Sequence, residues 1–180
     1  MSRKVTGLAL LLCAGMVSAD PSFAVPAEDA DVAPEVSAMA LPPGVVLREI
    51  FRIHRPKTNT HVTHFYWPDN WEDIGYQYEG TLGFISAAPF ENSVLIRNCV
   101  GPHSWNYFTS ADPDCEAATG GVVLPGDWHI GYISTVQVPG SVPLYRCGLI
   151  WQGKIRHFDS RDVACEGAGG TGGVLGYVFL

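Results

Sequence analysis

The feature that most constrains the fold of this chain is a set of three landmarks that recurs three times, in one order, from Leu47 to Leu180. Each recurrence marks one short repeat unit, which cannot bury a sheet face alone. Three such units that close around an axis share one core and leave no exposed strand edges. The chain is therefore predicted to be all-β, a β-trefoil of three divergent repeats: copy one (about 47–92), copy two (93–140) and copy three (141–180). The landmarks are Arg52, Arg97 and Arg146; then His64-Phe65, Tyr107-Phe108 and His157-Phe158; then Gly83-Phe84-Ile85, Gly131-Tyr132-Ile133 and Gly176-Tyr177-Val178.

The composition of residues 47–180 agrees with short strands. Glycine, aromatic and β-branched residues are frequent there, and Pro, Gly, Asn or Asp interrupts them every few positions. This pattern is typical of a sandwich or a closed barrel. The repeated Phe and Gly-aromatic positions are expected to be core and barrel-layer residues, because equivalent aromatic positions in a repeat serve packing first.

The cysteines follow the same repeat. Cys99 and Cys147 lie two and one residues after the arginine of their copy, and Cys115 and Cys165 each lie seven residues after the shared Phe. Copy one contains no cysteine. Three pairings are possible in principle, and the repeat selects two bridges within copies, Cys99 to Cys115 and Cys147 to Cys165.

The first residues are typical of an export signal. Arg3 and Lys4 precede an apolar run from Val5 to Val17, which is too short to span a bilayer. Small residues favour cleavage after Ala19, with a second possibility after Ala24. We therefore expect a signal peptide at 1–19, an acidic Ala/Pro-rich disordered linker at 20–46, and a secreted product, extracellular or periplasmic.

The charge of the chain limits its partners. Removal of residues 1–19 takes away two of the 11 Lys and Arg residues and none of the 18 Asp and Glu residues, so nine minus 18 leaves a net charge of minus nine. Such a protein repels phosphate backbones and anionic lipids. Nucleic-acid and membrane partners are therefore not expected, and the oligomeric state stays open.

Copy one carries a family resemblance. It contains Arg52 to Thr60 (Arg-Ile-His-Arg-Pro-Lys-Thr-Asn-Thr), then His64-Phe65-Tyr66, then Gly75-Tyr76-Gln77-Tyr78-Glu79-Gly80. This resembles a family of secreted β-trefoil-like repeats of unknown function, which typically read Tyr-Arg, His-Phe-Tyr-Thr and later Gly-Tyr with Glu-Gly. The resemblance implies attachment to glycans or cell-wall material. Trp67 replaces the usual Thr, and the last element is lost from copies two and three.

Sequence signatures of catalysis or metal binding are missing. The chain has no Gly-x-Ser-x-Gly, His-Glu-x-x-His or phosphate-loop motif. His54, His61 and His64 lie close together, but side chains three apart on a strand point to opposite faces. Asp112 to Glu116 lacks the glycine and closing glutamate of a helical calcium loop. No catalytic residue, metal site or cofactor is therefore expected.

The tryptophans are the best candidates for binding. Indole faces beside carboxylate and amide groups suit a sugar ring, whose C–H face packs on the ring while its hydroxyls find directional partners. Loop packing is the alternative role for any one of them. The sequence favours a secreted module that binds carbohydrate or cell-surface material; a protein-binding module such as a protease inhibitor, or a small secreted hydrolase, are the alternatives. The candidate ligand-binding residues are Trp67, Asp69, Asn70, Trp71, Trp105 and Trp128.

Overall fold

A computed structural model describes residues 41–180 except 68, 104 and 125–127; the predicted signal peptide and residues 20–40 of the predicted linker lie outside them. The described residues form strands and short 3-10 helices without an α-helix, which confirms the all-β prediction. Among them, no helix has the length and apolar character needed to cross a membrane. The elements are β1 (Leu47–Arg55), η1 (Pro56–Thr58), β2 (Thr60–His64), β3 (Gln77–Ser86), β4 (Ser93–Val100), β5 (Tyr107–Ser110), η2 (Ala117–Thr119), β6 (Val122–Val123), β7 (His129–Ser134), β8 (Ser141–Trp151), β9 (Lys154–Ser160), η3 (Cys165–Gly167) and β10 (Gly170–Phe179).

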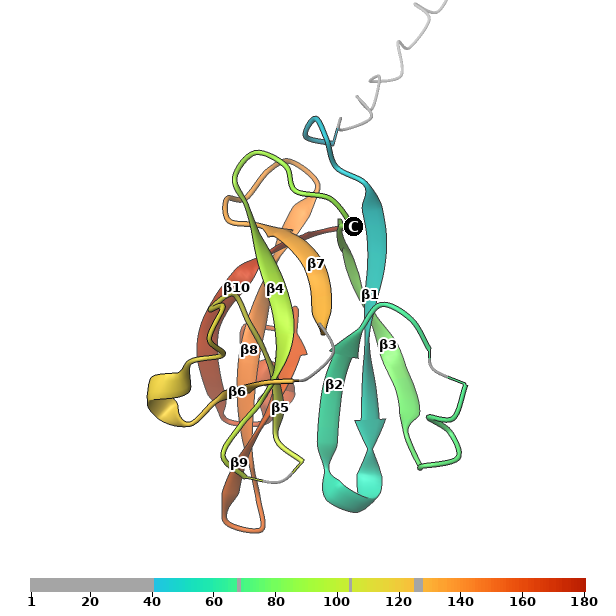
Figure 1. Cartoon of the computed structure of the whole chain (residues 1–180), viewed down its shortest axis with the longest axis vertical. Coiled ribbons are helices and arrows are strands. Elements are labelled where there is room, and N and C mark those ends of the chain that lie inside the picture. Colours follow the sequence, from blue (N-terminus) through green and yellow to red (C-terminus); the bar gives the residue numbers. More distant parts are fainter. Residues whose placement is uncertain (1–40, 68, 104, 125–127) are drawn as a thin grey trace, which may run out of the picture. The chain divides into compact units, whose positions relative to one another are not determined.

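The strands form one antiparallel sheet in which the same pairings occur in each copy. The first strand of a copy pairs with the second, as in β1 with β2, β4 with β5 and β8 with β9. It also pairs with the last, as in β1 with β3, β4 with β7 and β8 with β10. The last strands β3, β7 and β10 pair with one another. The turns of the β1–β2 and β8–β9 hairpins lie at the lower end of the molecule in Figure 1.

The three landmark glycines explain how the last strands approach one another. A β-carbon on Gly83 would lie 2.7 Å from the carbonyl oxygen of Phe179, and a β-carbon on Gly131 would lie 2.7 Å from that of Ser86. On Gly176 it would lie 2.6 Å from the carbonyl oxygen of Ser134. Real β-carbons do not come so close, so each copy needs a glycine where its last strand crosses that of the preceding copy.

The core lies between these strands. It contains the residues that follow the landmark aromatics, Ile85, Ile133 and Val178, all with 0 % exposure. The aromatics themselves are only partly buried, so the expectation that the Gly-aromatic positions form the core is wrong for them. Side chains alternate between the faces of a strand, and one residue of each pair must point away from the core. The aromatics concerned are Phe84, Tyr132 and Tyr177.

Strand register also corrects the landmark alignment in copy one. Cys99 lies opposite Phe108 and Cys147 opposite Phe158, but Ile53, their counterpart in copy one, lies opposite Val62 and not Phe65. His61-Val62 therefore takes the place expected for His64-Phe65. In the same way Asn98, and not Arg97, matches Arg52 and Arg146. Register is set by burial of one face, and a local sequence match can be displaced from it by a few residues.

Both predicted disulfides are confirmed. Cys99 bridges to Cys115 and Cys147 bridges to Cys165. The sulfur atoms are buried against Phe108 and Phe158, respectively. Each bridge closes the turn that follows the second strand of its copy, so these turns need little additional apolar core.

Candidate functional site

The copies are joined in part by arginines that bind the disulfide turn of the preceding copy. The guanidinium of Arg52 donates two hydrogen bonds to the Glu166 carboxylate, at 2.7 and 2.9 Å, and lies over the Phe158 ring. Arg146 makes an ion pair with Glu116 and lies over the Phe108 ring in the same way. Two of the three junctions therefore have the same construction.

The third junction, between copies one and two, is built differently. Asn98 stands in place of the arginine and donates through its side chain to the Thr63 carbonyl at 2.8 Å. Copy one has no disulfide turn; residues 65–76 occupy the corresponding stretch between β2 and β3. This stretch contains Phe65, Tyr66, Trp67, Trp71 and Tyr76 and has no disulfide.

Backbone hydrogen bonds hold residues 70–76 in a defined turn. The amides of Ile74, Gly75 and Tyr76 donate to the carbonyls of Asn70, Glu72 and Trp71, at 3.3, 2.9 and 2.9 Å. Gly75 has φ +89°, a conformation that favours glycine. The Trp71 ring packs on Tyr76 with centroids 4.9 Å apart, and Trp67 lies 6.4 Å from Trp71. The Trp67 indole therefore lies beside Trp71, which itself packs on Tyr76.

A cavity of about 730 Å³, open to solvent, lies beside this turn. Four aromatic side chains contribute to it, Phe51, Trp67, Tyr76 and Tyr78. The Phe51 ring lies 6.4 Å from Trp67 and 5.5 Å from Tyr78. Tyr76 is buried, and Tyr78 is 56 % exposed. The cavity has the size of a typical small-ligand site and an aromatic lining.

Two carboxylate side chains and one amide side chain also line this cavity. They belong to Glu49, Glu72 and Gln77, and all three residues are exposed. In the described part of the chain, neither glutamate side chain has a hydrogen-bond or ion-pair partner, and neither Lys nor Arg is among the residues that line the cavity. Burial raises the pKa of Tyr76 to about 12, so its hydroxyl stays protonated at neutral pH. The cavity thus offers apolar ring faces with free acceptors at its rim.

The structure places only one of the predicted binding residues in the lining of the cavity. Trp67 lines the cavity. Trp71 does not line it but packs on Tyr76, which does. Asp69 and Asn70 are exposed in the turn but are not part of the lining. The other two predicted tryptophans belong to copy two and lie away from the cavity.

Trp105 and Trp128 are not among the residues that line this cavity. Trp105 is 44 % exposed, and the guanidinium of Arg55 lies 4.8 Å from its ring centre. Trp128 is half-buried with its ring 6.0 Å from His64, beside a cavity of about 70 Å³. That volume is too small for a sugar, so Trp128 has a packing role there.

Sequence reasoning missed the lining residues that lie outside the tryptophan motif. Glu49 and Phe51 alternate along β1; Tyr78 lies in β3, and Tyr76 directly precedes that strand, two residues before Tyr78. Alternation along a strand places such pairs on one face. That signal was present in the sequence, but only the pairing of β1 with β3 brings the two pairs together.

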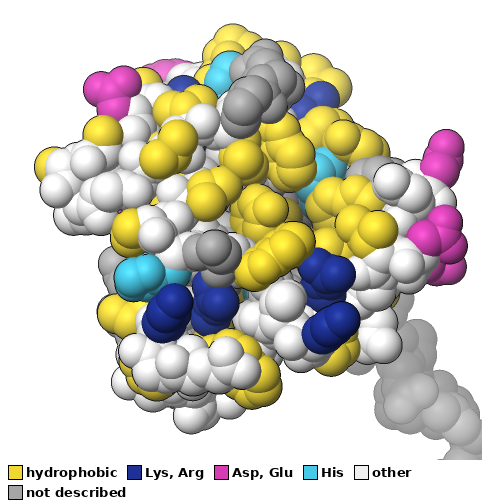
Figure 2. All heavy atoms as spheres, turned by 60° about the horizontal axis from the view of Figure 1, so that its bottom comes forward, with side chains coloured by type: hydrophobic (Ala, Val, Ile, Leu, Met, Phe, Trp, Pro, Cys, Tyr) yellow, Lys and Arg dark blue, Asp and Glu magenta, His cyan; other side chains and the backbone are white. Residues whose placement is uncertain are grey.

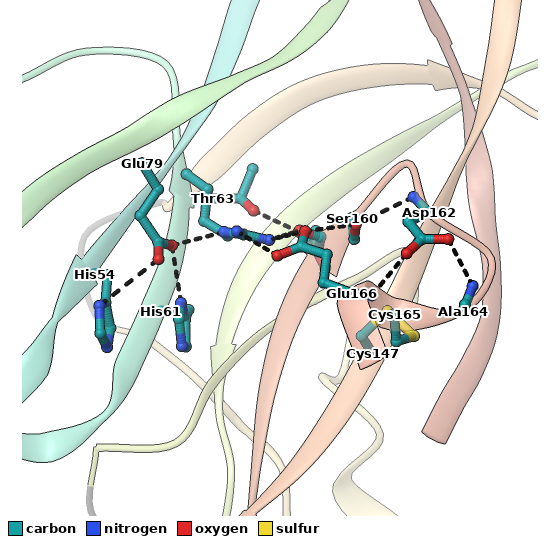
Figure 3. Close-up of polar contacts among 12 residues, drawn as sticks. His54, His61, Thr63, Glu79, Cys147, Ser160, Asp162, Ala164, Cys165 and Glu166 are labelled. Carbon is teal, nitrogen blue, oxygen red and sulfur yellow. Dashed lines mark hydrogen bonds and ion pairs between the residues drawn. A yellow bond between two sulfur atoms is a disulfide. The ribbon is translucent and has the colours of Figure 1, made fainter. Parts of the chain in front are cut away.

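A second polar cluster lies around Arg52 (Figure 3). Glu79 accepts from Arg52 Nε at 2.6 Å and faces the Nδ1 atoms of His61 and His54, at 2.9 and 3.6 Å. Burial acts to raise the pKa of Glu79, but the hydrogen bonds and charges of His61 and Arg52 outweigh it and hold the pKa at about 2. Glu79 is therefore a carboxylate at any pH near neutral.

Figure 3 also shows how the copy-three disulfide turn is held. The Asp162 carboxylate accepts from the amides of Ala164 and Glu166, at 2.8 and 2.9 Å, and the Asp162 amide donates to the Ser160 hydroxyl. Asp112 accepts from the amides of Asp114 and Glu116 in the equivalent turn. These carboxylates therefore cap the turn in each of the two copies.

The end of the molecule that carries the hairpin turns is a further surface. Figure 2 looks onto it and shows hydrophobic side chains gathered at its centre, with Lys and Arg side chains below them. This surface combines apolar groups with positive charge.

Comparison of the chain with models of known protein families, with curated proteins and with solved structures finds no match. The geometry of the cavity and of the polar cluster is thus the basis for assigning a function.

Proposed function

We propose that this chain is an exported glycan-binding module, a β-trefoil with a single binding cavity in its first copy. The observation that carries the proposal is the cavity formed by Phe51, Trp67, Tyr76 and Tyr78 with the free carboxylates of Glu49 and Glu72. Aromatic faces pack against the C–H face of a sugar, and carboxylates accept from its hydroxyls.

The β-trefoil part of the proposal is supported by the recurrence of the strand pairings and of the glycine contacts. Each contact joins a copy to the preceding one: Gly131 to Ser86, Gly176 to Ser134 and Gly83 to Phe179. This order is cyclic, as expected for three units around one axis. Export is supported by the apolar leader and by the two disulfides, which indicate an oxidising compartment.

A single site is proposed because the other copies use the equivalent stretch for a disulfide turn. In copies two and three that stretch is closed by Cys115 or Cys165 and held by an arginine of the next copy. Copy one alone has Trp67 and Trp71 there. We therefore expect one glycan site per chain.

The test is a screen of the disulfide-intact chain against glycans and cell-wall polysaccharides, followed by titration of each hit with tryptophan fluorescence. Trp67→Ala and Tyr78→Ala should each weaken binding about tenfold or more, a loss of about 1.4 kcal/mol. Trp105→Ala is the matched control, an exposed tryptophan outside the cavity that should leave binding unchanged. Trp71 is unsuitable for this test because it packs against Tyr76 and His64.

Three outcomes separate the alternatives. Saturable binding that depends on Trp67 and Tyr78, without release of reducing ends, supports the binding module. Release of reducing ends that is lost in Glu72→Gln would favour the hydrolase instead. A correctly folded chain that binds no glycan, or that binds equally well as Trp67→Ala and Tyr78→Ala, contradicts the proposed site.

A further inference from the structure

A histidine pair on the first hairpin lies outside the cavity and outside the proposed function. His54 on β1 lies directly opposite His61 on β2, and their rings stack with centroids 4.2 Å apart and planes 6° apart. Glu79 on the adjacent strand β3 lies above both rings in Figure 3, and each Nδ1 atom faces its carboxylate. Three neighbouring strands thus bring two imidazoles and one carboxylate to one place.

The tautomer of His54 makes its Nδ1 atom an available ligand. Its Nε2 atom lies 3.0 Å from the Oδ1 of Asn59. An amide oxygen only accepts, so Nε2 carries the hydrogen, and Nδ1 of the neutral ring keeps its lone pair. That lone pair faces a carboxylate oxygen of Glu79 at 3.6 Å, and a cation between these two acceptors would bind both.

Asn59 is itself held in place. It closes η1 in the left-handed conformation (φ 46°, ψ 49°), and its amide donates to the Pro56 carbonyl. Metal-binding histidines almost always donate their other ring N–H to an oxygen acceptor, usually a carboxylate, a backbone carbonyl or water, which orients the ring; the Asn59 amide oxygen is an acceptor of the same kind. Asn59 therefore has the position and the chemistry of a supporting residue for a metal-binding His54.

The surrounding charges permit a divalent cation. Arg52 binds Glu79 but keeps two hydrogen bonds to Glu166 if Glu79 turns away from it. Arg52, Glu79 and Glu166 together carry one positive and two negative charges, a sum of minus one. The side chains of His54, His61 and Glu79 are 21, 10 and 23 % exposed, so an ion can reach them from solvent.

We propose that His54, His61 and Glu79 bind a divalent first-row transition metal, and that Zn²⁺ fits best. The three ligand atoms lie within 4.8 Å of one another. Two imidazoles and one carboxylate are a known zinc donor set, which leaves a fourth position for water or a ligand. To bind at about 2 Å, both rings must turn out of their parallel stack, which the broad χ2 torsion of histidine allows.

The test is calorimetric titration of Zn²⁺ into the chelator-treated, disulfide-intact chain without an affinity tag. We expect one ion per chain with a micromolar or tighter Kd. His61→Phe keeps an aromatic ring beside His54 and Phe158, and Glu79→Gln keeps the size of the side chain; each should weaken binding at least tenfold. Asn59→Gly should weaken Zn²⁺ binding about tenfold, because glycine tolerates the left-handed conformation at this position but removes the side-chain acceptor for His54. His103→Ala, at an exposed histidine outside the cluster, should change nothing.

X-ray absorption of the Zn²⁺ form should show nitrogen and oxygen neighbours without sulfur. Circular dichroism and thermal unfolding of each variant check that it folds. If His61→Phe does not fold, Glu79→Gln provides the test by itself. Absence of saturable binding by the folded chain overturns the proposal. So does binding that remains unchanged in both His61→Phe and Glu79→Gln, because the ion would then sit elsewhere.

Discussion

A β-carbon built on Gly131 would lie 2.7 Å from the carbonyl oxygen of Ser86, which belongs to the preceding copy. The same contact recurs at Gly83 and Gly176, so three glycines set the distance at which the last strands of the copies cross. The aromatic after each glycine is partly exposed, and the β-branched residue after that is buried. The landmark triplet therefore encodes a close approach and a core residue together.

Gly131→Ala should be strongly destabilising. The new methyl group collides with Ser86 and Ile85, and the residue has φ +151°, a conformation that side chains disfavour. Gly80→Ala is the matched control, because Gly80 has φ +145° with nothing within 4 Å of the added carbon. We expect the backbone effect, about 1–3 kcal/mol, in both variants and a further ~1–3 kcal/mol from the collision in Gly131→Ala alone. Urea unfolding measures the difference, and equal losses would contradict the close approach.

Asp159 should matter as a hydrogen-bond acceptor more than as a charge. Its carboxylate is buried and accepts from the hydroxyls of Thr63 and Thr109. Asp159→Ala leaves both hydroxyls without this acceptor and should cost roughly 2–5 kcal/mol of unfolding free energy. Asp159→Asn keeps an oxygen at this position and should cost less.

The pH dependence of Asp159→Asn provides a second check. Burial raises the pKa of Asp159, so the folded state binds more protons than the unfolded state just above pH 3.8. Wild-type stability from this group is therefore greatest at low pH and is lost as pH rises through the folded pKa. The unfolding free energy of Asp159→Asn relative to wild type should be higher at pH 7 than at pH 4. A difference independent of pH would argue against a raised pKa.

His64 should make the fold sensitive to mild acid. It is buried beside Trp71 and Trp128, and burial lowers its pKa from 6.5 to about 4. Between these two pH values the unfolded chain binds a proton that the folded chain does not, so stability is full above pH 6.5 and falls toward pH 4. Relative to His64→Gln, wild type should lose up to about 3 kcal/mol over this range. His103→Gln, at an exposed position, is the control, and parallel curves for wild type and His64→Gln would refute the effect.

Each disulfide should contribute separately to stability. The bridges close segments of 16 and 18 residues, for which chain entropy predicts about 3 kcal/mol each. Replacing Cys99 and Cys115 together by Ala should lower the urea midpoint by a similar amount to replacing Cys147 and Cys165. Both replacements should also leave the cavity in copy one intact, since it contains no cysteine. Loss of glycan binding together with either bridge would contradict that independence.

The sequence by itself determined the all-β class and the disulfide pairing. Both depend on information that is local or repeated: frequent turn residues, short apolar runs, and two cysteine pairs in one register with the landmarks. Trp67 and Trp71 could be identified as neighbours for the same reason, because one short turn holds them. The landmark alignment of copy one was displaced, since His64-Phe65 imitates a motif that the register places at His61-Val62.

Only the tertiary structure decided which residues share a site. Glu49 and Phe51 reach Trp67 and Tyr78 through the pairing of β1 with β3, and Glu79 reaches His54 and His61 through the same pairing. Trp105 and Trp128 resemble Trp67 in sequence context but contact Arg55 and His64, respectively, outside the cavity. The physical reason is that strand pairing joins residues far apart in the chain, and its register follows from burial of the shared core, which no single segment contains.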